Sequence, residues 1–253
     1  MKITGNTILI TGGGSGIGRG LAKAFHVLGN KVIIASRREH LLKATIAANP
    51  GMEYLVLDQE SASGVRDFAR QVQKRYPKLN VLINNAGIQR VEDLTAGELF
   101  DAEATIAVNL LGPIRLTAAL IRRLMSQPYS AILNVSSALA MVPGAGVPTY
   151  CATKAAIHSY TQSLRFQLKH TPVQVIEIVP PWVQTELQGD RGMNPQAMPL
   201  NEFISEVMSI LTNSPQAAEI VVERAKAMRF AERGNYDEFF TRYNQGWADT
   251  QKR

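Results

Sequence analysis

Short apolar runs alternate with longer amphipathic stretches along the chain as far as Pro180. The short runs are rich in β-branched residues and bounded by glycine, asparagine or proline, a pattern typical of buried strands. They predict six strands, at residues 6–11, 31–36, 53–58, 80–87, 130–137 and 173–180. The amphipathic stretches predict helices over about 17–28, 38–48 and 63–76, in a long region ending at 125, and over 150–170.

Strands that alternate with helices form βαβ units, which place parallel strands in one sheet with helices on both faces. Right-handed crossovers then favour a doubly wound sheet of the Rossmann type, with strand order 3-2-1-4-5-6. The chain contains no internal repeat and no linker-like segment between its elements. We therefore expect residues 1–253 to form a single α/β domain.

The sequence changes character after Pro180. Residues 181–199 read "PWVQTELQGDRGMNPQAMP" and follow no period, as is common in a binding loop or a lid. Two helices are expected near 201–212 and 215–230, so residues 186–230 are interpreted as a substrate loop and its helices. The aromatic-rich tail, 231–253, is compatible with a short helix packed on the body of the protein or with a contact to a partner.

Composition narrows the classes of function. The formal net charge is +6, but the basic residues are spread along the chain among acidic ones, which favours a solvated surface over nucleic-acid binding. Cys151 is the only cysteine, which excludes an intrachain disulfide and fits a reducing cytoplasm. No apolar run reaches the eighteen or so residues of a membrane span, and the N-terminal run is too short for a signal peptide. We expect a cytoplasmic protein without a membrane or nucleic-acid partner.

A glycine-rich turn, "TGGGSGIG" at 11–18, joins the first predicted strand to the first helix. Glycines allow the backbone to approach a pyrophosphate, and a helix N-terminus presents free N–H groups and the positive end of its dipole. The spacing is Gly12-x-x-x-Gly16-x-Gly18, which departs from the G-x-G-x-x-G fingerprint because Ile17 stands where a glycine would be required. Its place between strand and helix predicts a dinucleotide site.

The end of the second strand distinguishes NAD from NADP. An acidic residue there would bind the ribose hydroxyls of NAD and repel the 2′-phosphate of NADP. The sequence instead reads "ASRRE", with Ser36 in place of the acid and Arg37 and Arg38 after it. Because a guanidinium binds phosphate in a bidentate manner, NADP(H) is the predicted cofactor, in preference to NAD(H).

Tyr150 and Lys154 stand four residues apart, so a helix places them on one face. A tyrosine with a pKa near 10 is a poor base at neutral pH. An ammonium ~4 Å away would lower that pKa by roughly two to three units at an effective dielectric near 20. The pair follows a strand that ends in "NVSS", at the sheet edge where α/β proteins bind ligands. This setting predicts an acid/base centre, with Ser136 or Ser137 beside it.

Taken together, the motifs resemble those of the short-chain dehydrogenase/reductase family. "TGGGSGIG", "NNAG" at 84–87, the asparagine of "IAVNLLG", "NVSS" and "YCATK" occur in the family's order and spacing, over about residues 5–187. The segments "INNAGIQR", "VPPWVQTEL" and "MPLNEF" look like the DltE-type branch of this family. No histidine or cysteine spacing indicates a metal site.

The resemblance implies a role for each matching position. Tyr150 would be the acid/base, and Lys154 would lower its pKa and bind the nicotinamide ribose. Ser137, thirteen residues before the tyrosine, would hold the substrate oxygen, and Asn109 would kink its helix and hold a relay water. The catalytic set is therefore Asn109, Ser137, Tyr150 and Lys154. The predicted cofactor-binding positions are Gly12, Ser15, Gly16, Ile17, Gly18, Arg37, Arg38, Asp58, Asn85, Ala86, Gly87, Tyr150, Lys154, Val183 and Thr185.

Two departures from the family pattern qualify these expectations. The family has Pro-Gly after its sixth strand and this chain has Pro180-Pro181, so the loop carrying Val183 and Thr185 is expected to be stiffer or displaced. No apolar run after Ala231 matches the usual seventh strand, which is therefore expected to be short or absent.

The expected function is NADP(H)-dependent interconversion of a ketone or aldehyde with its alcohol, by a homodimer or homotetramer that binds a small-molecule substrate. The alternative is a non-catalytic dinucleotide-binding redox sensor, since a fold alone never establishes activity.

Overall fold

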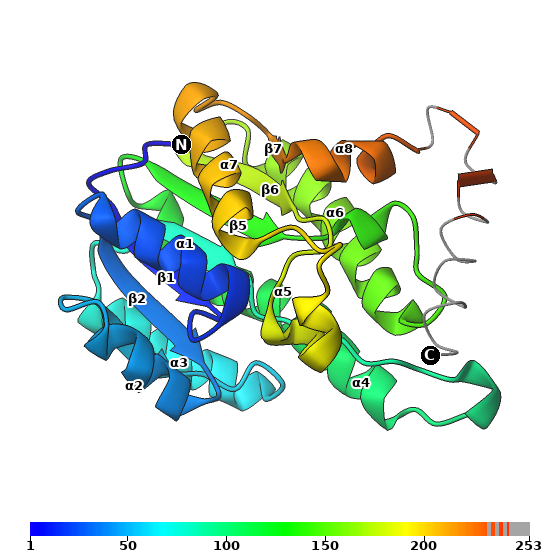
Figure 1. Ribbon diagram of the computed structural model, residues 1–253. Coiled ribbons are helices and arrows are strands. Elements are labelled where there is room, and N and C mark those ends of the chain that lie inside the picture. Colours follow the sequence, from blue (N-terminus) through cyan, green and yellow to red (C-terminus); the bar gives the residue numbers. More distant parts are fainter. Residues whose placement is uncertain (232–233, 236–237, 240–241, 243–253) are drawn as a thin grey trace.

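The computed structural model describes residues 1–231, 234–235, 238–239 and 242, apart from the side chains of residues 190, 191 and 193. Its seven strands form one parallel sheet in the order β3-β2-β1-β4-β5-β6-β7, so the predicted order of the first six is confirmed (Figure 1). The strands are β1 Thr7–Thr11, β2 Lys31–Ser36, β3 Glu53–Val56, β4 Val81–Asn84, β5 Ser130–Val135, β6 Val173–Val179 and β7 Glu219–Val221.

Helices cover both faces of the sheet. One buried cluster joins α1, α2 and α7 to side chains such as Ile10, Ile34 and Ile178, and the other joins α3 and α5 to side chains such as Leu9 and Val175. Successive strand residues therefore face opposite layers, as the two-residue period of a strand requires. The α-helices are α1 Gly16–Val27, α2 Glu39–Ala47, α3 Ala62–Arg75, α4 Phe100–Ile106, α5 Gly112–Met125, α6 Pro148–Gln167, α7 Leu200–Asn213 and α8 Glu223–Arg229. Shorter turns are η1 Leu94–Ala96, η2 Ala107–Leu111, η3 Ala138–Ala140 and η4 Glu186–Met193.

The prediction of one helix over 215–230 was wrong in its first half. Residues Glu219–Val221 form β7, which pairs with Glu177–Val179 of β6, and only Glu223–Arg229 are helical. The β-branched residues Ile220 and Val221 favour a strand where a free sheet edge offers hydrogen bonds. The seventh strand is therefore present and short. The expectations for the tail mostly concern residues outside those that the structure describes.

The strand order reverses between β1 and β4. These two strands are neighbours, and the chain continues from β1 into one half of the sheet and from β4 into the other half. At such a switch point, the connections leaving the two carboxyl ends diverge and leave a crevice. The glycine-rich turn leaves β1 at this point and the "NNAG" segment leaves β4. The fold thus brings these two motifs to the same edge of the sheet.

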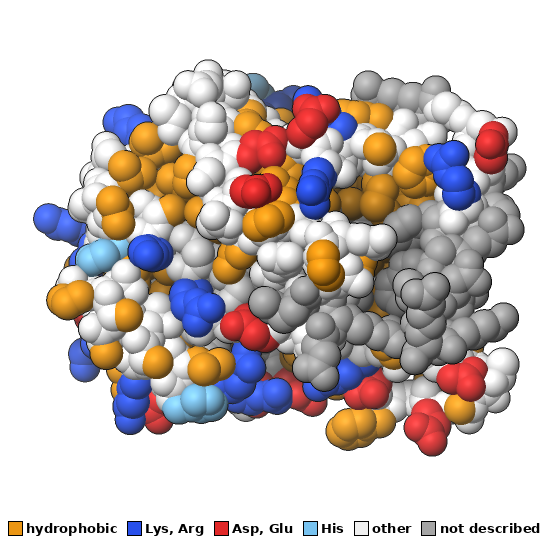
Figure 2. Space-filling model, viewed as in Figure 1, with side chains coloured by type: hydrophobic (Ala, Val, Ile, Leu, Met, Phe, Trp, Pro, Cys, Tyr) orange, Lys and Arg blue, Asp and Glu red, His pale blue; other side chains and the backbone are white. Residues whose placement is uncertain are grey.

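The helical stretch 100–125, formed by α4, η2 and α5, is long and apolar enough to span a membrane by length and composition. In the structure, α5 packs against α3 and the sheet, and buries Leu116 and Leu120. A helix that belongs to the core of a globular protein passes the same test of composition. On the face shown in Figure 2, lysine and arginine side chains lie scattered, with acidic side chains among them.

Candidate active site

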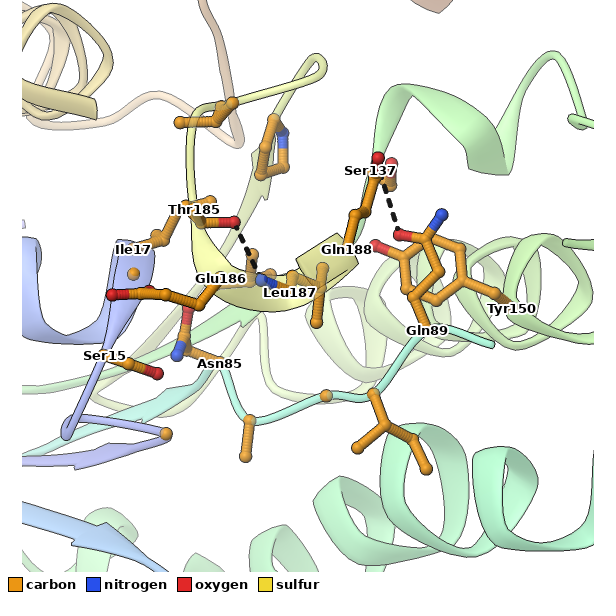
Figure 3. A pocket seen from close by; sticks show the side chains of 18 of the residues that line it. Ser15, Ile17, Asn85, Gln89, Ser137, Tyr150, Thr185, Glu186, Leu187 and Gln188 are labelled. Carbon is orange, nitrogen blue, oxygen red and sulfur yellow. Dashed lines mark hydrogen bonds between the residues drawn. The ribbon is translucent and has the colours of Figure 1, made fainter. Parts of the chain in front are cut away.

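A cleft of about 1580 Å³ lies along the carboxyl edge of the sheet. Its walls come from the turns after β1, β2, β3 and β4, from β5 and α6, and from the segment after β6. Figure 3 shows Ser15, Ile17 and Asn85 in one part of the cleft and Ser137 and Tyr150 in another. All the predicted site residues line the cleft except Gly18 and Asn109, which lie behind its walls.

The glycine-rich turn is held in a conformation that side chains would block. Gly12 has φ 71°, and a Cβ there would lie 2.7 Å from Asn85 Nδ2. A Cβ on Gly18 would lie 2.3 Å from the carbonyl oxygen of Gly12, far inside van der Waals contact. The turn therefore packs directly on the helix start and on the "NNAG" segment. This exposes the backbone N–H groups at the N-terminus of α1 to the cleft, as an anion site requires.

Ser36, Arg37 and Arg38 line the cleft beside this turn. Arg38 Nη2 donates to Ser15 Oγ at 3.0 Å, so its guanidinium reaches across to the glycine-rich turn. Arg37 lies 3.7 Å from Glu60, and both side chains are about half exposed or more. An exposed pair of this kind is weak, which leaves Arg37 available to a stronger anion.

The segments after β3 and β4 form the next part of the wall. Thr11 Oγ1 accepts hydrogen bonds from the backbone N–H groups of Asn85 and Ala86, both at 3.0 Å, which fixes the "NNAG" backbone beside β1. Asp58 lines the cleft, and so does Gln59, which the sequence analysis did not single out. Both polar atoms of the Gln59 side chain are buried without a hydrogen-bond partner among the described residues. Such orphaned groups are costly, so this wall suits a polar ligand.

Ser137 and Tyr150 are both nearly buried and both line the cleft. The Ser137 hydroxyl accepts a hydrogen bond from the N–H of Leu139 at 3.1 Å, which orients it at the start of η3. The Ser136 hydroxyl instead donates to the carbonyl of Ile178 on β6, at 3.4 Å. Figure 3 shows the Ser137 and Tyr150 side chains on the same side of the cleft. Of the two serines, Ser137 therefore has the better-placed hydroxyl.

Lys154 lies one helical turn after Tyr150 on α6, and its Nζ is 5.5 Å from the centre of the tyrosine ring. Its ammonium donates to the carbonyl of Val135 at 2.8 Å. Burial lowers the pKa of Lys154 to about 8, and the negative charge of Glu177 acts in the opposite direction. The lysine thus places a buried, titratable cation directly behind the tyrosine.

Asn109 lies in η2, a π-helical turn between α4 and α5. Its side-chain amide accepts from the N–H of Ile88 and donates to the carbonyl of the same residue, each at 2.8 Å. It also donates to Thr153 on α6 at 3.3 Å. The side chain therefore ties the helix to the "NNAG" loop and to the Tyr150 helix. A π-helical turn interrupts the regular helix there, as turns of this type often do at functional sites.

The double proline does not move its loop away from the cleft. The Pro180 carbonyl accepts from the N–H of Ala138 at 2.8 Å, which joins the loop to η3. Val183 forms a bridge with Met198, and the Thr185 side chain packs against Gly16, where a Cβ would lie 3.2 Å from it. Both predicted residues consequently line the cleft beside the glycine-rich turn.

Two glutamines near Tyr150 were not predicted. Gln188 Nε2 donates to Gln89 Oε1 at 3.3 Å, and the pair bridges the walls beside Ser137 and Tyr150 (Figure 3). Gln188 belongs to η4, which is kinked at Gln188 and Gly189. The position of Gln89, two residues after the "NNAG" segment, is a signal that the sequence offered. The position of Gln188, in contrast, depends on how the late loop folds back.

A group of ionisable residues around the buried Glu177 also went unpredicted. The side chains of His158, Glu177 and Glu219 meet with their polar atoms within 4.8 Å of one another. Both oxygens of Glu219 are already bound by Arg229, at 2.8 and 3.0 Å, which identifies an ion-pair network. Cys151 is buried as well, and burial raises the pKa of its thiol to about 11, which fits a structural role.

The site and fold define an oxidoreductase built on a dinucleotide-binding sheet. The family model described as short chain dehydrogenase matches residues 6–196, and the chain belongs to the short-chain dehydrogenase/reductase family. It is 41% identical over 250 residues to the oxidoreductase DltE of Bacillus subtilis, covering 96% of this chain and 98% of that one. The resemblance stated from the sequence, including its DltE-type branch, is thereby confirmed.

Solved structures agree with this assignment. A short-chain dehydrogenase from Burkholderia cenocepacia in complex with NADP has a TM-score of 0.82 and 26% identity, covering 96% of this chain and 99% of that one. A family member from Burkholderia phymatum in complex with NAD also has a TM-score of 0.82, at 20% identity, covering 92% and 95%. Similar structures thus occur with either dinucleotide.

Proposed function

We propose that this enzyme interconverts a ketone or aldehyde with the corresponding alcohol, using NADP(H). The observation that carries the proposal is the shared cleft: Ser137 and Tyr150 line the same cavity as the glycine-rich turn, with the Lys154 ammonium buried behind the tyrosine. A fold of this family could be kept for binding alone. A complete set of acid/base side chains in the cavity favours catalysis over that alternative.

The residues present fit a dinucleotide. A Cβ would fill the cradle at Gly12 and Gly18, and the buried amide of Gln59 lacks a partner among the described residues. Residues of the glycine-rich turn would bind the pyrophosphate, Asp58 and Asn85–Gly87 the adenosine, and Val183 and Thr185 the nicotinamide end. When bound, the cofactor supplies the hydride that reduces the carbonyl carbon, or accepts it in reverse.

Residues of the chain itself would transfer the proton and bind the substrate oxygen. The Tyr150 hydroxyl donates its proton to the substrate oxygen as the carbonyl carbon is reduced, and the Ser137 hydroxyl holds that oxygen beside it. The Lys154 cation stabilises the phenolate left on Tyr150 because opposite charges attract strongly in a buried site. Asn109 keeps the "NNAG" loop and α6 together, so that these groups retain their spacing.

NADP is preferred over NAD in this proposal because of the side chains after β2. No carboxylate occupies the Ser36 position, and the Arg38 guanidinium is already held over the turn by Ser15. A 2′-phosphate would meet two guanidinium groups there, and charge-assisted hydrogen bonds to Arg are among the stronger ones in proteins.

The test is NADPH consumption with a broad panel of ketones and aldehydes. We expect turnover by the wild type and a loss of at least about a hundredfold in kcat for Tyr150→Phe, the range of general acid catalysis. Tyr160→Phe changes a tyrosine of the same helix that does not line the cleft, so it should retain activity. Turnover that survives in Tyr150→Phe would refute the assigned mechanism. NADPH binding without turnover of any panel member would favour the sensor.

The late segment and the exposed helices suggest two further parts of the proposal. Gln89 and Gln188 present amides beside Tyr150, so a small substrate with a polar group near its carbonyl would be held best.

Phe100 is 82% exposed on α4 and Phe166 is 68% exposed on α6, which favours subunit contacts through these helices in a homodimer or homotetramer. Light scattering after size exclusion would measure the number of subunits.

A further inference from the structure

A row of polar side chains crosses the sheet just before the strands reach the cleft. Asn84 of β4 is in register with Asn134 of β5, Asn134 with Glu177 of β6, and Glu177 with Glu219 of β7. The asparagines are neutral and bonded, since Asn84 donates to Asn134 at 2.8 Å and Asn134 donates to Thr161 at 2.9 Å. The charges of this row are therefore confined to the two glutamates.

Glu177 is fully buried, and its hydrogen-bond partner is His158 of α6. His158 Nδ1 lies 2.8 and 3.0 Å from the two carboxylate oxygens, and Gln162 Nε2 lies 3.0 Å from the other ring nitrogen. A buried carboxylate is costly to desolvate, so each cation near it contributes to holding its charge.

Two arginines lie near this group. Arg229 of α8 binds both oxygens of Glu219. Arg165 of α6 donates to the backbone carbonyls of Val175, at 2.9 Å, and Ala218, at 2.7 Å, and its charge also acts on Glu219. The remaining titratable side chains on α6 are Tyr150, Cys151, Lys154 and Tyr160, and those on α8 are Glu223, Arg224 and Lys226.

Lys154 lies on the same face of α6 as His158, one turn earlier, and is buried. Its ammonium is bonded to the carbonyl of Val135, which directly follows Asn134, the register partner of Glu177. The ammonium is therefore bonded to the strand that neighbours the strand of Glu177, and neighbouring strands are about 4.8 Å apart. In a buried site, opposite charges on adjacent strands interact appreciably.

We propose that Glu177 is a positioning residue for catalysis: its buried carboxylate is the counter-ion that keeps Lys154 charged at neutral pH. The proposal rests on the proposed function, in which the Lys154 cation stabilises the Tyr150 phenolate. Desolvation of Lys154 pulls its pKa down to about 8, and Glu177 raises it. Without that carboxylate, the lysine would lose its proton within the neutral range, and Tyr150 would lose the charge that makes it a useful acid/base.

The first test titrates Lys154 directly, by NMR of its Cε resonance in the full-length protein without substrate. The resonance is identified by its absence from Lys154→Met. Glu177→Gln keeps the shape and a hydrogen-bond acceptor for His158, and we expect it to lower the midpoint by about one pH unit. Glu219→Gln removes a carboxylate one strand further away and should leave the midpoint within a few tenths of a unit. An unchanged midpoint in Glu177→Gln would overturn the proposal.

The second test is the pH profile of NADPH-dependent reduction. The alkaline limb should move to lower pH by about the same amount in Glu177→Gln, while the rate on the acid side is retained. A uniform fall in rate at every pH would indicate a structural effect and count against the proposal. Because the titration needs no turnover, a shifted midpoint in a protein that reduces no carbonyl would contradict the proposed function and leave the ion pair standing.

If Glu177→Gln does not fold, the double variant Glu177→Gln/Lys154→Met decides the question. A lone buried charge is strongly destabilising, whereas removal of both partners is often neutral. We therefore expect the double variant to recover a cooperative thermal transition close to that of the wild type. A double variant that remains unfolded would show that Glu177 does not pair with Lys154.

Discussion

Arg38 provides the sharpest test of the cofactor assignment. Its guanidinium is held over the glycine-rich turn by the hydrogen bond to Ser15 Oγ, so little ordering remains to be done when an anion arrives. A 2′-phosphate carries close to two negative charges at neutral pH. At ~4 Å in water-like surroundings each unit pair contributes about 1 kcal/mol, so Arg38→Ala should cost NADPH about 2 kcal/mol, or roughly thirtyfold in Kd.

The assay is a fluorescence titration, because Trp182 lines the cleft. NADPH and NADH are each titrated into the wild type, Arg38→Ala and Arg37→Ala. NADH lacks the phosphate and should bind the three proteins within a factor of about three. Arg37→Ala should cost NADPH less than Arg38→Ala, since Arg37 must first leave Glu60. Arg70→Ala, on α3 and outside the cleft lining, removes the same charge and should change neither affinity.

Two results would refute this reasoning. A wild type that binds NADH more tightly than NADPH would show that "ASRRE" was interpreted incorrectly. An equal loss of both dinucleotides in Arg38→Ala would show that the arginine supports the shape of the turn through Ser15 and does not recognise the phosphate.

Three further predictions concern the glycine-rich turn, the buried lysine and the buried thiol. Gly18→Ala should lower the free energy of unfolding by about 1–3 kcal/mol and weaken dinucleotide binding at least tenfold, because its Cβ would lie 2.3 Å from the Gly12 carbonyl. Thermal melting and a binding titration measure the two effects, and unchanged values would contradict the packing. Lys154 has a pKa lowered from 10.5 to about 8, so between these pH values the unfolded chain holds the proton and the folded chain does not. The free energy of unfolding, measured in urea, should therefore rise with pH across this window by on the order of 3 kcal/mol relative to that of Lys154→Met. Parallel pH curves for the two proteins would refute this prediction. Cys151, with its pKa raised to about 11 by burial, should resist iodoacetamide at pH 8 in the native protein and react once the protein is unfolded in urea; rapid native labelling would contradict its burial.

Much of the fold could be predicted because its signals are local. The six predicted strands all exist, and the helices that follow them begin and end within a few residues of their predicted bounds. The strand over 80–87 was predicted too long, since only Val81–Asn84 pair with neighbours. The residues beyond, Asn85–Gly87, bend away to line the cleft. A functional loop that continues a strand has the same local sequence as the strand itself, so its end is decided by pairing.

The candidate site was predictable where spacing along the chain carries the geometry. Tyr150 and Lys154 share a helix face, and the turn after the first strand must lie at the carboxyl edge of the sheet. Glu177 and Gln59 carry no such signal. Glu177 is a single charged residue inside the apolar strand β6, and Gln59 lies three residues after β3. The importance of each depends on which side chains other elements bring to it.

The sequence by itself determined the alternation of strands and helices, the glycine-rich turn, and the placing of Tyr150 and Lys154 on one helix face, because periodicity and short-range spacing specify these features. The choice of Ser137 over Ser136 came from the resemblance to the family. Only the tertiary structure decided that Glu219–Val221 complete the sheet, that Gln89 and Gln188 meet beside the tyrosine, and that Glu177 faces the layer of α6 that holds Lys154. The physical reason is that free sheet edges, buried charges and amide pairs are satisfied by partners distant in the chain. Their energies depend on distances in space, which no local pattern records.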